Sequence, residues 1–322
     1  MRVSSELRAL RADPAAQRQL QDNVQAAKRN WLGQERVALM FRDLERFANG
    51  AGLQACPALE RVFTAPGIAA SVAEGLMGEL IPAMRANNFA HPPFPYQYSD
   101  GLAIMELAAV GNARLSLMML EGDALHERGE ARSISFADCE RHEVIVAGQA
   151  SARIVRRTGP DNGPARLDFE AMELVPGVIL SFDGPYSTRL VDHVPSRLVT
   201  LRLTRVPDLP EPSREYRLSD GVLVHQSSGD RDESRAELAM ALLGKMGRKD
   251  AAPVLARMAR TGSDNFRWQA IRECLALDAA EGFRVLTQVA RDMEDPLAAP
   301  AGALRAQLLE NYPQLETVEC PA

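Results

Sequence analysis

The spacing of apolar residues predicts a helical region over residues 1–95. Between Trp31 and Phe47 the apolar positions are mainly three or four residues apart, which is the spacing of one face of an α-helix. We expect several helices here, whose Leu and Met positions form an ordinary hydrophobic core. Helix boundaries are marked by polar caps, by glycine, and by proline in a first turn, at Asp13-Pro14, Asn49-Gly50, Pro57 and Pro66.

The pattern then changes from a helical period to alternation. Pro92, Pro93 and Pro95 exclude a helix and favour an extended segment. Beyond them apolar and polar residues alternate, most clearly over residues 199–206, as expected for strands with one buried face. We therefore expect residues 96–228 to form an antiparallel β-region. Turn residues recur at strand-length intervals, at Gly111-Asn112, Gly122-Asp123, Pro176-Gly177 and Asp183-Gly184-Pro185.

Helical spacing returns over residues 229–322, together with a weak internal repeat. Residues 253–260 align with residues 283–291, and in each case an acidic loop and another helical segment follow. This pattern resembles HEAT-type repeats, whose helix pairs stack to bury their apolar faces. We expect antiparallel helical pairs with a shared core formed by Leu238, Leu242, Val254, Leu255, Met258, Trp268, Ile271, Leu275, Leu286 and Val289.

Composition and charge narrow the class of protein. With 322 residues, the chain is long enough for two or three domains. Its formal net charge of −6 argues against nucleic acid as a partner, because phosphate contacts need clustered Lys and Arg. No apolar run is long enough to span a bilayer, and the N-terminus lacks the apolar region of a signal peptide. We expect a cytoplasmic protein that does not bind membranes and whose widely spaced cysteines are reduced.

Two segments of the β-region resemble the two conserved halves of the cupin (RmlC-like jelly-roll) superfamily. The first runs from His142-Glu143 through an apolar strand and the Gly148 turn, and the second contains Pro176-Gly177, a short strand and the turn at residues 183–185. The resemblance implies a multidomain α and β protein, with an antiparallel cupin-like β-barrel flanked by the N-terminal helical region and the C-terminal HEAT-like helical pairs.

The metal ligands that the family resemblance implies are largely missing. Ser187, Thr188 and Arg189 stand where the second-half histidine would be, and His142 is the one histidine in the first half. Cys139 and Glu143 are the other ligand-like residues nearby. Successive residues of a strand point to opposite faces, so His142 and Glu143 cannot easily both enter a barrel. We therefore expect no bound metal and no other cofactor.

Arg189 offers a different chemistry at the same place. A guanidinium group can bind a carboxylate or phosphate through two parallel hydrogen bonds. Together with Tyr186 and Thr188, it forms the candidate ligand site, for a small anionic or amphipathic molecule. The alternative is that Arg189 points outward and pairs with Asp183 or Asp192 at the surface.

No nucleophile-elbow, phosphate-loop or dinucleotide-binding motif occurs in the chain. The sequence therefore favours a non-catalytic, ligand-sensing or protein-interaction role, with an unidentified protein partner or small ligand. We also expect a homodimer, because a jelly-roll has an exposed sheet edge and the repeat stack is only half capped. The alternative is a metal-dependent cupin enzyme, an oxygenase or isomerase, with ligands drawn from His126, His142, His193, Glu143 and Cys139.

Overall fold

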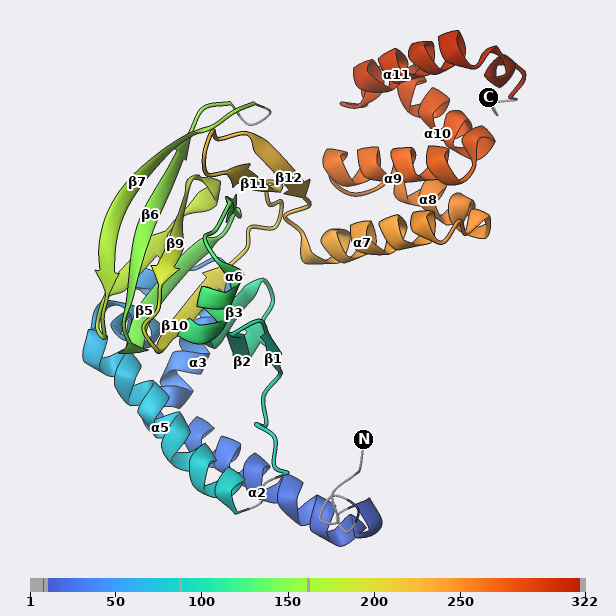
Figure 1. Cartoon of the computed structure of the whole chain (residues 1–322). Helices are drawn as coiled ribbons and strands as arrows, with labels where there is room; N and C mark the ends of the chain where they lie inside the picture. Colours follow the sequence, from blue (N-terminus) through green and yellow to red (C-terminus); the bar gives the residue numbers. More distant parts are fainter. Residues whose placement is uncertain (1–7, 9–10, 87–88, 161–162, 319–322) are drawn as a thin grey trace. The chain divides into compact units, whose positions relative to one another are not determined.

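The chain forms two compact units, whereas the sequence suggests three regions, 1–95, 96–228 and 229–322. Unit 1 comprises Met1–Asp208 with Tyr216–Val222, and unit 2 comprises Leu209–Glu215 with Leu223–Ala322. The N-terminal helices and the β-strands fall in one unit because they share a hydrophobic core. The computed structural model describes residues 8, 11–86, 89–160 and 163–318 (Figure 1).

Three of the four N-terminal helices of unit 1 begin, and one ends, at a boundary that the sequence predicts. They are α2 (Pro14–Leu32), α3 (Glu35–Ala48), α4 (Pro57–Thr64) and α5 (Pro66–Arg85). Asp13 accepts hydrogen bonds from the N–H groups of Ala15 and Ala16, at 2.9 and 3.0 Å. The buried Asp43 carboxylate does the same for α4, because it accepts the N–H of Ala58 at 2.7 Å. These contacts satisfy backbone donors that a helix leaves free at its N-terminus.

The β-region is antiparallel, as predicted from residue 96 onwards. A six-stranded sheet has the order β1-β2-β3-β10-β5-β8, and a three-stranded sheet has the order β7-β6-β9. The strands of the first sheet are β1 (Tyr96–Ser99), β2 (Leu102–Val110), β3 (Ala113–Glu121), β10 (Arg197–Arg205), β5 (Glu140–Gly148) and β8 (Ile179–Phe182). Those of the second sheet are β6 (Ala150–Thr158), β7 (Arg166–Leu174) and β9 (Ser187–His193).

One face of the six-stranded sheet packs against the N-terminal helices. The core there combines helical residues such as Trp31, Met40 and Phe47 with Val144 of β5 and Leu203 of β10. The indole Nε1 of Trp31 donates a hydrogen bond to the carbonyl oxygen of Val72 at 3.3 Å, which joins α2 to α5. These two helices lie side by side in Figure 1.

A second core lies between the two sheets. It combines Ile145 of β5, Leu180 of β8 and Leu198 of β10 with Ala152 and Ile154 of β6. Val144 and Ile145 are neighbours in sequence but belong to different cores, because successive side chains of a strand point to opposite faces. Strand β5 is therefore buried on both faces, and this double burial positions the site described below.

The remaining elements of the β-region are short. Helix α6 (Gly122–Arg128) follows β3, and β4 (Ser133–Phe136) precedes β5. Strands β11 (Ser213–Arg217) and β12 (Leu223–Ser227) lie where the chain passes between the two units.

Unit 2 ends in five helices among its described residues: α7 (Arg231–Lys245), α8 (Ala252–Met258), α9 (Asp264–Leu277), α10 (Ala279–Arg291) and α11 (Ala298–Asn311). The two aligned sequence segments form α8 and α10, and each is followed by a second helix. Glu233 of α7 accepts hydrogen bonds from the N–H and the hydroxyl of Ser263, at 2.7 and 2.6 Å. This contact ties α7 to the start of α9. Whether the helices follow the HEAT architecture stays a prediction.

The expected core of unit 2 is correct in its centre and wrong at its first helices. Leu255, Ile271 and Leu286 are fully buried. In contrast, Leu238 and Leu242 are 72% and 59% exposed, and Val254 is 43% exposed. Helix α7 buries Met240 instead, so its buried face differs from the one that the apolar spacing suggested. No described helix in either unit has the length and apolar character needed to cross a membrane.

Candidate functional site

Strand β5 carries charged residues on its inter-sheet face. Arg141 and Glu143 alternate with His142 and Val144 along the strand. The ring of His142 lies 6.5 Å from that of Phe47, on the helix-facing side. Arg141 and Glu143 therefore point to the opposite face, towards the second sheet. Neighbouring strand β10 places Arg202 directly beside Glu143.

Three arginines converge on the Glu143 carboxylate, and we call these four residues the arginine–glutamate cluster. Arg202 donates from Nε to Glu143 Oε1 at 2.7 Å, and its Nη2 lies 2.6 Å from the same oxygen. Arg189 of β9 brings its Nε to 3.3 Å from Oε2, and Arg141 brings its Nε to 3.5 Å from Oε1. The cluster thus bridges the two sheets.

Burial makes the charges of this cluster unusual. The Glu143 side chain has no exposed surface, and those of Arg189, Arg141 and Arg202 are 6%, 16% and 23% exposed. Three positive charges therefore face one negative charge inside the protein. Burying a charge without a partner is costly, and such groups are paired or bind an ion. The positive excess makes an anion the complementary ligand.

The pKa values in the cluster follow from this arrangement. Burial by itself would raise the pKa of Glu143, but the positive charges of Arg202, Arg189 and Arg141 hold that pKa below its ordinary value. Burial lowers the pKa of Arg189, Glu143 opposes this effect, and the other two arginines reinforce it. Glu143 is therefore ionised at neutral pH, and Arg189 gains from any further negative charge placed beside it.

The lowered pKa of Glu143 predicts a loss of stability in acid. The unfolded chain protonates this carboxyl around pH 4.3, whereas the folded protein holds it ionised to a lower pH. Its contribution to the free energy of unfolding is therefore complete above that pH and is lost as the pH falls towards the folded pKa. Urea unfolding of the wild type and Glu143→Gln between neutral and acidic pH should show the stability difference shrinking. A constant difference would contradict the assignment.

Unsatisfied donors indicate where an additional ligand would bind. Within the arginine–glutamate cluster, the buried nitrogens Arg189 Nη1 and Arg141 Nε lack a hydrogen-bond acceptor, and the buried oxygen Glu143 Oε2 lacks a donor. Arg141 Nη2 donates to Thr188 Oγ1 at 3.1 Å, which fixes the direction of that guanidinium group. Buried donors in folded proteins are normally satisfied. An anion accepting from these two guanidinium groups would supply the missing partners.

The structure brings together two of the three residues of the candidate ligand site. Arg189 and Thr188 both contact the cluster, whereas the ring of Tyr186 lies 5.2 Å from the Arg157 guanidinium and is 52% exposed. The alternative, in which Arg189 points outward and pairs with Asp183 or Asp192, is wrong, because its side chain is 6% exposed and lies beside Glu143. Asp192 pairs instead with Arg153, at 2.7 Å.

The candidate metal ligands do not fit a metal centre. His142 and Glu143 point to opposite faces of β5. Cys139 is close to the cluster, where burial raises the pKa of its thiol. His126 and His193 line a separate hollow with Glu130. Within residues 8, 11–86, 89–160 and 163–318, no three His, Cys, Asp or Glu side chains are arranged to hold a metal.

Sequence reasoning missed Arg141 and Arg202, which supply much of the charge of the cluster. Both occupy the positions of an alternating strand that do not face the helices. Such positions are occupied by charged residues whenever a strand has one face in water. The one available signal was the coincidence of Arg141 and Glu143, two residues apart and hence on one face. It could not show that this face is covered by a second sheet.

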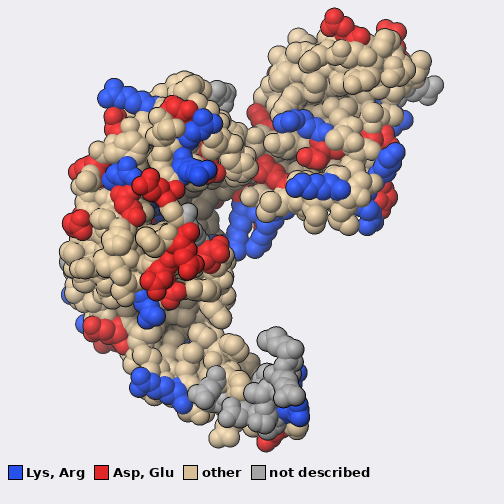
Figure 2. All heavy atoms as spheres, in the orientation of Figure 1, with Lys and Arg blue, Asp and Glu red and all other residues tan. Residues whose placement is uncertain are grey.

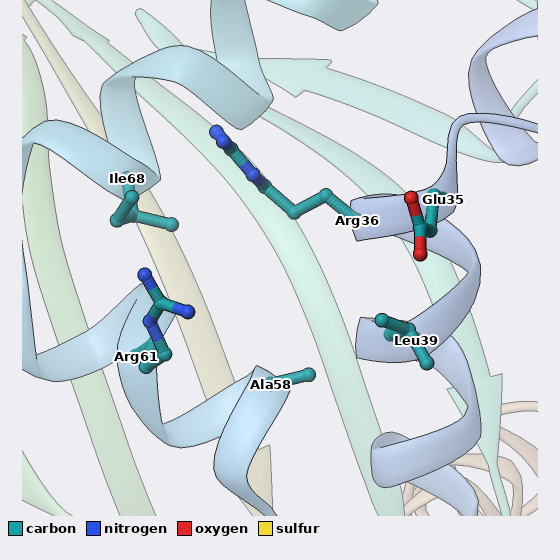
Figure 3. A pocket seen from close by; sticks show the side chains of 6 residues that line it. All are labelled: Glu35, Arg36, Leu39, Ala58, Arg61 and Ile68. Carbon is teal, nitrogen blue, oxygen red and sulfur yellow. The ribbon is translucent and has the colours of Figure 1, made fainter.

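A second arginine pair lies at the surface of unit 1. Figure 3 shows Arg36 of α3 and Arg61 of α4 extending into a hollow of 270 Å³, beside Glu35 and Ile68. Both arginines are exposed, and Arg36 donates to Ser71 Oγ at 3.0 Å. Charges in water are screened, and exposed pairs contribute about 0–1 kcal/mol. The charges at this surface hollow are therefore less in need of a counter-ion than those of the buried cluster.

The surface charge gives no indication of a nucleic-acid site on the face drawn in Figure 2. Acidic side chains gather there over the strands of unit 1, and Lys and Arg are scattered. Nucleic-acid binding depends on clustered basic residues that contact phosphates.

Comparisons with known proteins find only weak structural similarity, over part of the chain. No family model and no curated protein matches the chain. Solved structures of cupin-superfamily proteins align with it, each over a minor part of its length. KdgF from a Halomonas species is 14% identical with a TM-score of 0.25 and covers 35% of this chain and 88% of its own.

Two further structures are similar to the same extent. A cupin-superfamily protein from Desulfitobacterium hafniense is 16% identical, with a TM-score of 0.24, over 34% of this chain and 83% of its own. A sugar phosphate isomerase of the cupin superfamily from Silicibacter pomeroyi is 13% identical, with a TM-score of 0.26, over 41% of this chain and 88% of its own.

Proposed function

We propose that this protein is a non-catalytic sensor whose degenerate, cupin-like β-region binds a small anion at the arginine–glutamate cluster. The observation that carries the proposal is the buried excess of positive charge, together with the unsatisfied Arg189 Nη1. Guanidinium groups bind carboxylates and phosphates through paired hydrogen bonds. We therefore infer a ligand with a carboxylate or phosphate group. Arg202 and Arg141 keep part of their side chains in solvent.

A regulatory role is favoured over the alternative enzyme by the side chains available. Among the described residues, His142 pairs with Glu140 at 2.9 Å, but no three His, Cys, Asp or Glu side chains are arranged to hold a metal. A metal-assisted oxygenase or isomerase reaction therefore lacks the ligand set that such metals use. Unit 2 supports a protein-interaction role within the same proposal. Helix α7 and its C-cap residue expose Leu238, Leu242 and Met246, which are four residues apart and form one apolar stripe.

The test is calorimetric titration with phosphate, sulfate and succinate, at constant ionic strength with chloride as the reference ion. We expect saturable binding of one anion per chain, and a loss of at least about tenfold in affinity for Arg189→Gln. Arg153→Gln is the matched control, because Arg153 forms an exposed pair with Asp192. It should bind as the wild type does.

Two results would refute this proposal. Equal affinities of the wild type and Arg189→Gln would place any anion elsewhere. One equivalent of a transition metal per chain, found by elemental analysis of the purified protein, would favour the enzyme instead. Binding is measured at a temperature where circular dichroism shows both variants folded, so that unfolding does not imitate a loss of affinity.

A further inference from the structure

An apolar cavity of 470 Å³ lies in unit 1, on the side of the six-stranded sheet opposite to the arginine–glutamate cluster. Its wall on the helix side consists of Ala70, Ala73, Glu74 and Met77 of α5. Its floor is formed by strands β2, β3, β5 and β10, and Pro92 and Tyr96 close one side. Small-molecule sites have volumes of about 300–1,000 Å³ and are mostly apolar, so this cavity has the size and lining of a ligand site.

The sequence explains why the cavity exists. Helix α5 packs its large residues Val72, Leu76 and Leu80 into the helix–sheet core. Its adjacent face carries the small residues Ala70 and Ala73, which meet the sheet beside the cavity. Small residues on a packed face leave space that larger ones would fill. The remaining space of 470 Å³ accommodates an extended aliphatic chain.

Methionine is concentrated around this cavity. Met77, Met105, Met118 and Met119 all line it. Methionine is unbranched and adapts its shape, and it is over-represented on surfaces that bind varied apolar partners. Met118 lies between Leu117 and Met119 on β3, so its side chain points to the other face of the sheet. The side chains of Met77, Met105 and Met119 can repack around an aliphatic chain that enters the cavity.

One charge determines the head group that fits. Glu74, which is exposed on α5, is the one charged side chain among the described residues that line the cavity. A carboxylate at the opening attracts a cation and repels an anion. The net charge of the whole chain, −6, acts in the same direction at longer range.

We propose that this cavity binds a cationic amphiphile, with its aliphatic chain between α5 and the sheet and its amine beside Glu74. The site is independent of the arginine–glutamate cluster, which takes ligands of the opposite charge on the other face of the sheet. It would give the protein a second ligand of a different chemical class.

Three probes with the same chain test the proposal: decylamine, decanol and decanoate, titrated calorimetrically into the full-length protein below the concentration at which each forms micelles. We expect decylamine to bind one per chain, with decanoate about tenfold weaker and decanol between them. Glu74→Gln should bring decylamine and decanoate to similar affinities without changing that of decanol. Glu45→Gln removes an exposed charge on α3 and should leave all three affinities unchanged.

A second variant tests the cavity itself. Ala73→Leu fills it while keeping a good helix former, and it should abolish the binding of all three probes while thermal unfolding stays cooperative. Ala15→Leu, at an exposed position of α2, is the control. The proposal is wrong if no probe binds the wild type, if decanoate binds best, or if Ala73→Leu binds as tightly as the wild type. If no probe binds, and sedimentation shows that the wild type is a dimer whereas Ala73→Leu is a monomer, the cavity is a contact with a second copy of the chain.

Discussion

Replacing Glu143 by glutamine should lower the free energy of unfolding by about 3–5 kcal/mol at low ionic strength. Glutamine keeps the size of the side chain but removes the one negative charge of the cluster, so that three buried or half-buried guanidinium groups repel one another. Breaking a buried ion pair by removing one partner is costly for this reason. Urea unfolding followed by circular dichroism measures the change.

Anions should partly restore the stability of Glu143→Gln. A ligand that binds only the folded state stabilises it by about 2.7 kcal/mol at a concentration one hundred times its Kd. Phosphate should therefore stabilise the variant more than it stabilises the wild type.

The control for Glu143→Gln is Glu170→Gln, which breaks the exposed pair with Arg156 and should lower the free energy of unfolding by less than about 1 kcal/mol. If Glu143→Gln is as stable as this control, the Glu143 carboxylate does not stabilise the protein through the three arginines.

Replacing Leu255 by alanine should lower the stability of unit 2 by about 2–5 kcal/mol. Leu255 has no exposed surface and lies in the core that joins α8, α9 and α10. Its truncation removes buried apolar surface and leaves a cavity that the neighbouring helices fill only in part. The measurement is thermal unfolding, followed by the circular dichroism of the α-helices.

The matched control for Leu255 is a leucine of the same unit. Leu238 is 72% exposed, so Leu238→Ala should change the stability by less than about 0.5 kcal/mol. A loss for Leu238→Ala as large as that for Leu255→Ala would mean that the apolar stripe of α7 is covered in solution. A loss well under 1 kcal/mol for Leu255→Ala would contradict the helix packing.

Local patterns predicted the elements well because the responsible interactions are local. The cap at Asp13, the end of α3 at Asn49, and the helix starts at Pro57 and Pro66 are all present. The antiparallel β-region begins at Tyr96, where the period changes. Closure of a barrel, HEAT packing and a homodimer remain predictions, because they depend on contacts between distant segments.

The candidate site could be predicted only in part. Arg189 was found because it replaces an expected histidine, and its depth depends on the register of β9 against β6, which pairs it with Ile154. A turn precedes this strand, so the sequence left its phase open. The prediction of which face of α7 is buried was wrong for a related reason. Its apolar residues occupy more than one face, and tertiary packing selected Met240 rather than Leu238.

We propose that the buried cluster, and not an exposed arginine, holds a small anion. A crystal grown with selenate and measured at the selenium absorption edge would locate the anion directly. We expect an anomalous peak within hydrogen-bonding distance of Arg189 Nη1 and Arg141 Nε. A peak only at exposed arginines such as Arg36 or Arg61, or none at the cluster, would contradict it.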